Sequence, residues 1–327
     1  MNTDLKTQII ELVTPDLVQV EQALEENLAP NLELVKQIAS HLLFSGGKRL
    51  RPLLLIHAAR MCNYQGTDEI VFSTIFEFLH AATLLHDDVV DGADMRRGRP
   101  AAHTLWPAAQ VVLTGDFLLA RALDIAAKTQ DPRVIAVIAQ ITQAMSQGEI
   151  NQLAQKGRKD VTEDQYLEII ERKTAVLIQG ACQCGAILAK VSGQKEQALQ
   201  AFGFHLGMAF QMADDLLDYT ATAEQLGKYP GADMREGKLT LPVIYSLARA
   251  GPEDREWMEN MISYPGVDVD LFQKLQQKLV TLKGISYTRA KACDHVAKAK
   301  KNLEIFDDSV SKSVLTLIAD YAIHRKV

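Results

Sequence analysis

The sequence predicts an all-α fold, and three features of the chain support that prediction. Helix-favouring residues such as Ala, Leu and Gln are abundant, and apolar residues recur every three or four positions, as in residues 35–44 and 288–306. No segment shows the convincing apolar–polar alternation of a half-buried β-strand. The glycine and proline breaks are short, so none is a clear interdomain linker. We therefore expect a single helical domain spanning residues 1–327.

The composition excludes several classes of protein. With 47% hydrophobic residues, the 327-residue chain has ample material for a core, which argues against disorder. The net charge of −6 gives no electrostatic reason to expect nucleic acid as a partner. Four irregularly spaced cysteines are typical of reduced thiols in a cytosolic protein, and no apolar stretch reaches the roughly 18 residues of a membrane span. We expect a cytoplasmic protein without a transmembrane segment, and peripheral contact with a membrane stays open.

Two clusters of aspartates interrupt apolar segments. The stretches LLHDDVVD (84–91) and MADDLLDY (212–219) share the pattern D-D-x-x-D. On a helix the first and last aspartates of each cluster lie one turn apart, where like charges cost about 0.3 kcal/mol. A solvated acidic face is the ordinary explanation for one such cluster, but apolar flanks place both near the core. Oxygen ligands favour Mg²⁺, and the six candidate metal ligands are Asp87, Asp88, Asp91, Asp214, Asp215 and Asp218.

Basic residues gather in three islands beside these clusters. SGGKRLRP (45–52) follows a Gly-Gly turn, DMRRGRP (94–100) follows the first acidic helix, and LGKYPGADMREGK (226–238) follows the second. A solvated loop or a nucleic-acid patch is the ordinary explanation for one island. Carboxylates that hold metal ions, together with cations that contact phosphate oxygens, fit a polyphosphate ligand better.

The motifs together resemble those of the trans-isoprenyl diphosphate synthases, the polyprenyl synthetase family. The matching segments are GGKRLRP (46–52), EFLHAATLLHDDVVDGADMRRGRP (77–100), GD (115–116), ERKTA (171–175), AFQMADDLLDY (209–219) and LGKYPGADMREGKLTLP (226–242). They occur in the family's order, and residues 1–30 form a less well matched N-terminal helical segment. The resemblance implies an isoprenoid-synthase-type helical bundle around a deep central cavity.

The resemblance also implies a reaction and assigns residues to it. Members of this family join isopentenyl diphosphate to an allylic diphosphate with Mg²⁺ as cofactor, about two or three ions accompanying the diphosphate. The allylic diphosphate would contact Arg96, Lys173, Lys228 and Lys238, and isopentenyl diphosphate would contact Lys48, Arg51, His80 and Arg97. Thr174 and Gln211 would line the reacting centre, so that the catalytic set is Asp87, Asp88, Lys173, Thr174, Gln211 and Asp214. His86 projects about 100° away from Asp87, so we expect it to pack or to donate a supporting hydrogen bond rather than to act as a base.

Product length in this family depends on the pocket that receives the growing tail. The two residues at the wall of that pocket are Ala82 and Thr83, where short-chain synthases often have an aromatic residue. Small side chains imply a long product, and we expect the floor one helix deeper, near Leu123. The chain is most similar to bacterial octaprenyl diphosphate synthases. That similarity implies a C40 product made from farnesyl diphosphate for the ubiquinone side chain, and a homodimer.

Other functions account for the sequence less well. A shorter-chain farnesyl or geranylgeranyl diphosphate synthase is the first alternative, and the side chains at the pocket wall discriminate it. A non-catalytic subunit of a heteromeric prenyl synthase would typically have degraded aspartate motifs, whereas both are intact here. A cyclising terpene synthase would not be expected to keep GGKRLRP, and a structural helical bundle would not explain two acidic clusters.

Overall fold

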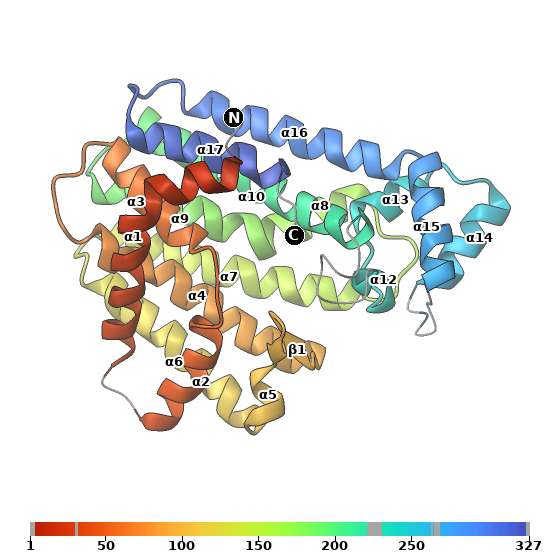
Figure 1. Ribbon diagram of the computed structural model, residues 1–327, viewed down its shortest axis with the longest axis horizontal. Coiled ribbons are helices and arrows are strands. Elements are labelled where there is room, and N and C mark those ends of the chain that lie inside the picture. Colours follow the sequence, from red (N-terminus) through yellow and green to blue (C-terminus); the bar gives the residue numbers. More distant parts are fainter. Residues whose placement is uncertain (1–3, 30–31, 221–230, 263, 265–268, 325–327) are drawn as a thin grey trace. The chain divides into compact units, whose positions relative to one another are not determined.

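The computed structural model describes residues 4–29, 32–220, 231–262, 264 and 269–324 (Figure 1). Helices account for nearly all the regular structure, so the all-α prediction is confirmed. Contacts group the chain into two compact units, one formed by residues 1–140, 180–200 and 305–315, and the other by residues 141–179, 201–304 and 316–327. No helix in the described part of the chain is both long and apolar enough to cross a bilayer. The deep central cavity stays a prediction.

The first unit begins with six helices in chain order. They are α1 (Leu5–Leu28), α2 (Glu33–Leu43), α3 (Leu50–Met61), α4 (Glu69–Asp91), the short α5 (Ala102–Leu105) and α6 (Ala108–Ala127). Helix α4 packs against α1, α3 and α6, and its apolar part before the aspartates buries Phe76, Phe78 and Leu85. Since α4 ends at the first aspartate cluster, this packing fixes the helix end that presents the carboxylates.

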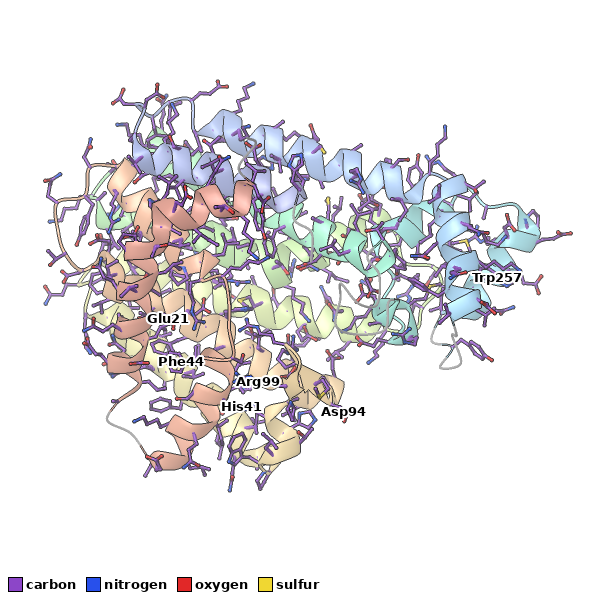
Figure 2. All side chains as sticks on the ribbon, in the orientation of Figure 1. Glu21, His41, Phe44, Asp94, Arg99 and Trp257 are labelled. Atoms are coloured by element: carbon purple, nitrogen blue, oxygen red, sulfur yellow. The ribbon has the colours of Figure 1, made fainter. Side chains whose placement is uncertain are left out.

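A two-stranded ribbon follows α4, which the sequence did not predict. Strand β1 (Met95–Arg96) pairs antiparallel with β2 (Arg99–Pro100). The connecting residues Arg97 and Gly98 both have positive φ, 51° and 73°, as a tight two-residue hairpin turn requires. Residue His41 of α2 lies against the ribbon, with Nε2 2.8 Å from the Pro100 carbonyl oxygen, and Figure 2 labels it near Asp94 and Arg99.

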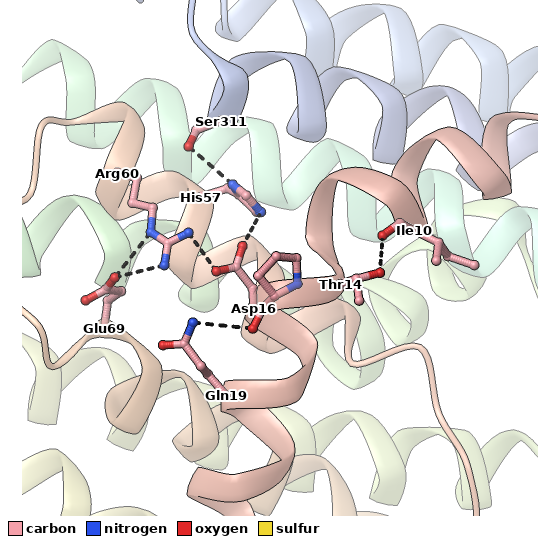
Figure 3. A network of polar contacts seen from close by, with 9 residues as sticks. Ile10, Thr14, Asp16, Gln19, His57, Arg60, Glu69 and Ser311 are labelled. Atoms are coloured by element: carbon pink, nitrogen blue, oxygen red, sulfur yellow. Dashed lines mark hydrogen bonds and ion pairs between the residues drawn. The ribbon is translucent and has the colours of Figure 1, made fainter.

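A buried ionic network fastens α1 to α3 and α4 within this unit (Figure 3). Arg60 donates to Asp16 at 2.7 Å and to Glu69 at 3.1–3.2 Å. His57 lies 3.5 Å from Asp16 and 3.2 Å from the Ser311 hydroxyl. Buried charges are stable only when paired, and here each carboxylate faces the same guanidinium.

The remaining helices run from α7 to α17, and α7, α9, α10 and α17 contribute residues to both units. They are α7 (Pro132–Gln155), α8 (Glu163–Ile170), the π-helical turn η1 (Glu171–Ala175), α9 (Val176–Leu188), α10 (Gln194–Thr220), α12 (Ala232–Arg235), α13 (Leu241–Leu247), α14 (Pro252–Met261), α15 (Val269–Thr281), α16 (Gly284–Asn302) and α17 (Val310–His324).

The core of the second unit lies among α8, α10, α13, α15 and α16. Tyr166, Met212, Tyr219 and Leu241 are among its buried side chains. A capping box begins α8, because the Thr162 hydroxyl accepts from the Gln165 amide while the Gln165 side chain accepts from the Thr162 amide. This core surrounds the helix that carries the second aspartate cluster.

Candidate active site

The first aspartate cluster occupies the last turn of α4. Asp88 is only 1% exposed, whereas Asp87 and Asp91 are half-buried. Arg96 of β1 donates from Nε to Asp88 Oδ1 at 2.9 Å and makes a second bond to the same oxygen through Nη2. The buried charge of the cluster is therefore balanced by a residue from the adjoining basic island, and Asp87 is left more accessible.

The first two basic islands meet in the first unit. Arg97 donates to the carbonyl oxygen of Gly46, which joins the ribbon to the turn that carries Lys48. Burial lowers the pKa of His80 well below its usual value, and the nearby guanidinium groups of Arg51 and Arg97 lower it further. His80 is therefore a neutral imidazole surrounded by cations, an environment suited to a polyanion. The four residues expected to bind isopentenyl diphosphate lie in these neighbouring segments.

The second aspartate cluster lies near the end of α10 in the second unit. Asp214 is exposed, whereas Asp215 and Asp218 are 5% and 4% exposed. Burial raises the pKa of Asp215, and the charges of its two neighbouring aspartates raise it further, although hydrogen bonds oppose the shift. Those bonds come from the Tyr166 hydroxyl at 2.6 Å and the Gln211 amide at 2.8 Å.

Asp218 also stabilises the start of α12, in addition to belonging to the cluster. Its carboxylate accepts the backbone N–H groups of Ala232 at 3.3 Å and Asp233 at 3.1 Å. These groups begin α12, which leads to Lys238 of the third basic island. Lys238 lies 2.8 Å from Glu236. Lys228, the other predicted cation of this island, lies outside the described residues.

The ERKTA motif forms the π-helical turn η1, which presents two predicted catalytic residues. The Thr174 hydroxyl donates to Gln211 Oε1 at 2.8 Å, and Gln211 in turn donates to Asp215. Lys173 pairs with Glu149 of α7. Wider π-turns inside α-helices are frequent at functional sites. The structure therefore joins three predicted site residues, Thr174, Gln211 and Asp215, in one hydrogen-bonded chain.

Sequence reasoning missed two members of this second-unit site. Tyr166 lies on α8 and bonds Asp215, and Glu149 lies on α7 and pairs with Lys173, so both are distant in sequence from the aspartate motif. Glu149 lies within the polar run QGEIN, which has no charge pattern of its own. Tyr166 lies in the mixed segment EDQYLEII, which gives no sign of a site residue, and its hydroxyl partner is visible only in three dimensions.

The residues predicted to determine product length differ in burial and lie on two helices, α4 and α6. Ala82 is 4% exposed within α4, and the Thr83 hydroxyl donates to the His80 carbonyl oxygen at 2.9 Å. Leu123 is 40% exposed on α6 in the single chain. Its role as a pocket floor stays a prediction. His86 Nε2 lies 3.0 Å from the Val112 carbonyl oxygen, a supporting contact of the kind expected.

The donor chemistry of both clusters fits Mg²⁺. Within the described parts of the chain, no three His, Cys, Asp or Glu side chains are already gathered around a common point. Burial is the main cause of the raised pKa of Asp215, and the charges of Asp214 and Asp218, crowded on the same helix, add to it. A divalent cation would relieve this crowding, and carboxylates with phosphate oxygens are ligands that Mg²⁺ accepts.

Comparisons with known proteins agree with this chemistry. Residues 32–279 match the family model described as polyprenyl synthetase. The chain belongs to the polyprenyl synthetase family. It is 36% identical over 318 residues to octaprenyl diphosphate synthase of Escherichia coli K12, which covers 97% of this chain and 98% of the relative. It is 33% identical to geranylgeranyl diphosphate synthase of Methanosarcina mazei, over 94% and 95% of the two chains.

A solved structure extends the likeness to three dimensions. The polyprenyl synthase of Caulobacter crescentus CB15, complexed with calcium and isoprenyl diphosphate, superposes with a TM-score of 0.92 at 37% identity and covers 98% of each chain. The chain described here therefore has the all-α isoprenoid synthase fold. Its family identifies it as a trans-polyprenyl diphosphate synthase whose substrates are isopentenyl diphosphate and an allylic diphosphate.

Proposed function

We propose that this synthase extends farnesyl diphosphate with isopentenyl diphosphate to octaprenyl diphosphate, the C40 precursor of a ubiquinone side chain. The observation that carries the long product is a pair of small side chains on α4, the buried Ala82 and the half-buried Thr83, one turn before the first aspartate cluster. Small side chains there leave room that an aromatic ring would fill. Similarity to the octaprenyl enzyme of Escherichia coli supports the same length.

We propose that the two aspartate clusters hold Mg²⁺ with the allylic diphosphate. When bound, the ions supply Lewis-acid withdrawal of charge from the diphosphate oxygens. Arg96, Lys173 and Lys238 contribute the positive side chains that face the leaving diphosphate. Because the ion pairs of Arg96 with Asp88 and of Lys173 with Glu149 already exist, these cations are held in place before substrate binds.

Isopentenyl diphosphate is held by Lys48, Arg51, Arg97 and His80. Since the pKa of His80 is lowered, its imidazole is neutral at pH 7 and donates one N–H to a diphosphate oxygen without adding charge. Thr174 and Gln211 line the reacting carbon. The allylic C–O bond breaks, the isopentenyl double bond forms the new C–C bond, and the released pyrophosphate takes the proton.

We propose further that the enzyme is a homodimer. Helix α6 has an exposed stripe at positions 109, 113, 120, 123 and 127, which recur every three to seven residues and are all Ala or Leu. Leu113 is 65% exposed in the single chain. Asp116, whose side chain is 58% exposed, lies within this stripe, and the exposed apolar residues on either side of it form a helix face typical of a protein contact. Light scattering should give twice the mass of one chain, and a monomeric mass at micromolar concentration would reject the proposal.

A shorter product is the second candidate, because a geranylgeranyl enzyme is also among the similar proteins. The deciding experiment is a product assay. The purified chain is incubated with Mg²⁺, farnesyl diphosphate and labelled isopentenyl diphosphate, and the dephosphorylated products are sized. A main product of eight isoprene units supports the proposal, whereas products of three or four units from shorter primers reject the C40 length. No Mg²⁺-dependent elongation from any primer would indicate a non-catalytic subunit.

A further inference from the structure

Arg49 lies between Lys48 and Arg51, two residues proposed to bind isopentenyl diphosphate, but its side chain points into the protein. It is 3% exposed. Its Nε donates to Glu21 Oε1 at 2.6 Å and its Nη2 to Glu21 Oε2 at 3.0 Å, a bidentate pair. A further bond joins Nη2 to the Leu43 carbonyl oxygen at 2.6 Å.

The same guanidinium also reaches α4. Arg49 Nη1 donates to Glu77 Oε1 at 2.8 Å, and Glu77 is 4% exposed. Glu77 precedes His80 by three residues, so the two lie about one turn apart on α4. Arg49 therefore connects the turn that carries Lys48 to the helix that carries His80.

The backbone of Arg49 is strained. Its φ of 45° and ψ of 36° are left-handed, a conformation that side chains other than glycine rarely adopt. Such a conformation persists only where the surroundings over-determine it. The contacts that do so are the two carboxylates and the Leu43 carbonyl, and they set the direction in which α3 leaves the turn with Arg51 on its first turn.

Glu21 is contributed by α1, which precedes the residues matched by the family model (32–279). Figure 2 labels Glu21 on that helix. Helix α1 therefore does not only pack against the core, because its Glu21 carboxylate pairs with the buried guanidinium of Arg49. Other carboxylates of α1 serve differently: Asp16 pairs with Arg60, away from the turn.

The structure assigns Glu21 of the N-terminal helix and Arg49 a shared positioning role, in which they hold the Lys48–Arg51 turn in register with His80 for isopentenyl diphosphate. Neither residue contacts the reacting atoms. The inference rests on the proposed function of this turn, and it adds the N-terminal helix to the elements that determine affinity for the five-carbon substrate.

The test uses Glu21→Gln in the full-length chain. Glu21 has a 42% exposed side chain, so the variant should fold. Losing one charged partner should let the turn shift, and the KM for isopentenyl diphosphate should rise about tenfold, since small misplacements of binding groups are costly. The KM for the allylic substrate and kcat at saturation should not change. Glu25→Gln, an exposed acid one turn along the same helix, is the matched control and should resemble the wild type.

Further variants and a binding measurement distinguish failure of the positioning role from failure of the proposed function. Glu21→Asp, which keeps the charge, should keep much of the affinity for isopentenyl diphosphate. Arg49→Lys keeps the charge but cannot make the bidentate pair of a planar guanidinium, so it should lose that affinity. Equilibrium dialysis with labelled isopentenyl diphosphate should show the same tenfold loss for Glu21→Gln without any elongation. An unchanged KM and dialysis constant in an active enzyme would overturn the positioning role alone. Absence of elongation by the wild type would instead overturn the proposed function.

Discussion

At the scale of single residues, the aspartates of one motif have different environments. Asp88 is buried and bonded to Arg96, while Asp87 is half-buried in the same turn of α4. We expect Asp87→Ala to lower kcat at least about a hundredfold, because losing one group that stabilises transition-state charge costs that much. The steady-state rate of isopentenyl diphosphate incorporation with Mg²⁺ measures the effect.

The matched control for this prediction is Asp94→Ala. Asp94 is an exposed aspartate three residues past the motif, and the part of it that bonds Ala101 is its backbone oxygen. Its substitution should leave kcat within about twofold, because surface changes away from special features are small. Near wild-type turnover of Asp87→Ala would contradict the proposed metal role of the first cluster.

A pair of histidines is expected to make the stability of the second unit depend on pH. His205 of α10 and His295 of α16 have their Nδ1 atoms 3.0 Å apart, so one nitrogen donates and the other must be unprotonated. Burial, together with the charges of His205 and Lys298, lowers the pKa of His295 to about 4. The unfolded chain takes up this proton near pH 6.5. Stability is therefore full above about pH 6.5 and falls as the pH drops towards 4.

Replacing His295 should reduce this fall in stability with decreasing pH. We expect His295→Gln to unfold with a midpoint in urea that changes less between pH 7 and pH 5 than the wild-type midpoint does. The control is His324→Gln, because His324 is exposed and its ring contacts only a backbone oxygen, that of Asp320, among the hydrogen bonds described. Equal slopes for the His295 variant and the wild type would show that the pair does not titrate in this range.

At the scale of elements, the π-turn η1 is held between two glycines. A Cβ on Gly148 of α7 would lie 2.9 Å from the Lys173 backbone nitrogen, and one on Gly207 of α10 would lie 2.5 Å from the Ala175 Cα atom. Both distances are shorter than van der Waals contact with backbone, which cannot move as a flexible side chain can. The two glycines therefore let α7 and α10 approach the turn that presents Lys173 and Thr174.

Gly207→Ala should destabilise the protein although alanine favours helix. The helical gain is about 1 kcal/mol, whereas overpacking against backbone costs about 1–3 kcal/mol, so the clash should dominate. We expect a lower melting temperature and a raised KM for the allylic substrate as Thr174 moves away from Gln211. Gly251→Ala is the control, since its Cβ meets open space at φ −64°. A Gly207 variant as stable and active as this control would show that η1 tolerates the shift.

The elements also show what a sequence can predict. Helices with three- and four-residue spacing were predicted because their signal is local, and each aspartate cluster was placed within one turn for the same reason. The π-turn and the burial of Arg49 were not predicted, because each depends on partners 20 or more residues away, such as Glu77 for Arg49. The Arg97–Gly98 hairpin is local, with Arg96 paired to Arg99, but its two-residue strands are too short to show an alternating pattern. The identity of the catalytic residues came from motif resemblance, and their hydrogen bonds came only from the structure.

At the scale of the whole molecule, the proposed tail pocket predicts that product length depends on the side chain at position 82. Ala82→Phe should shorten the main product, because a ring at this buried position of α4 would fill space that the growing chain needs. The cost in stability should be about 1–3 kcal/mol. Ala81→Phe is the matched control, since Ala81 is equally buried at 3% exposure but points about 100° away around the helix.

The two variants separate a pocket effect from general damage. If Ala82 lines the tail pocket, its phenylalanine variant makes shorter products at a normal first-addition rate, while Ala81→Phe makes the wild-type length even if it is less stable. Product size is read by chromatography of the dephosphorylated alcohols, and stability by thermal denaturation. Equal product ladders from both variants would remove Ala82 from the pocket wall, and the open space that determines chain length would then have to lie on another face of α4.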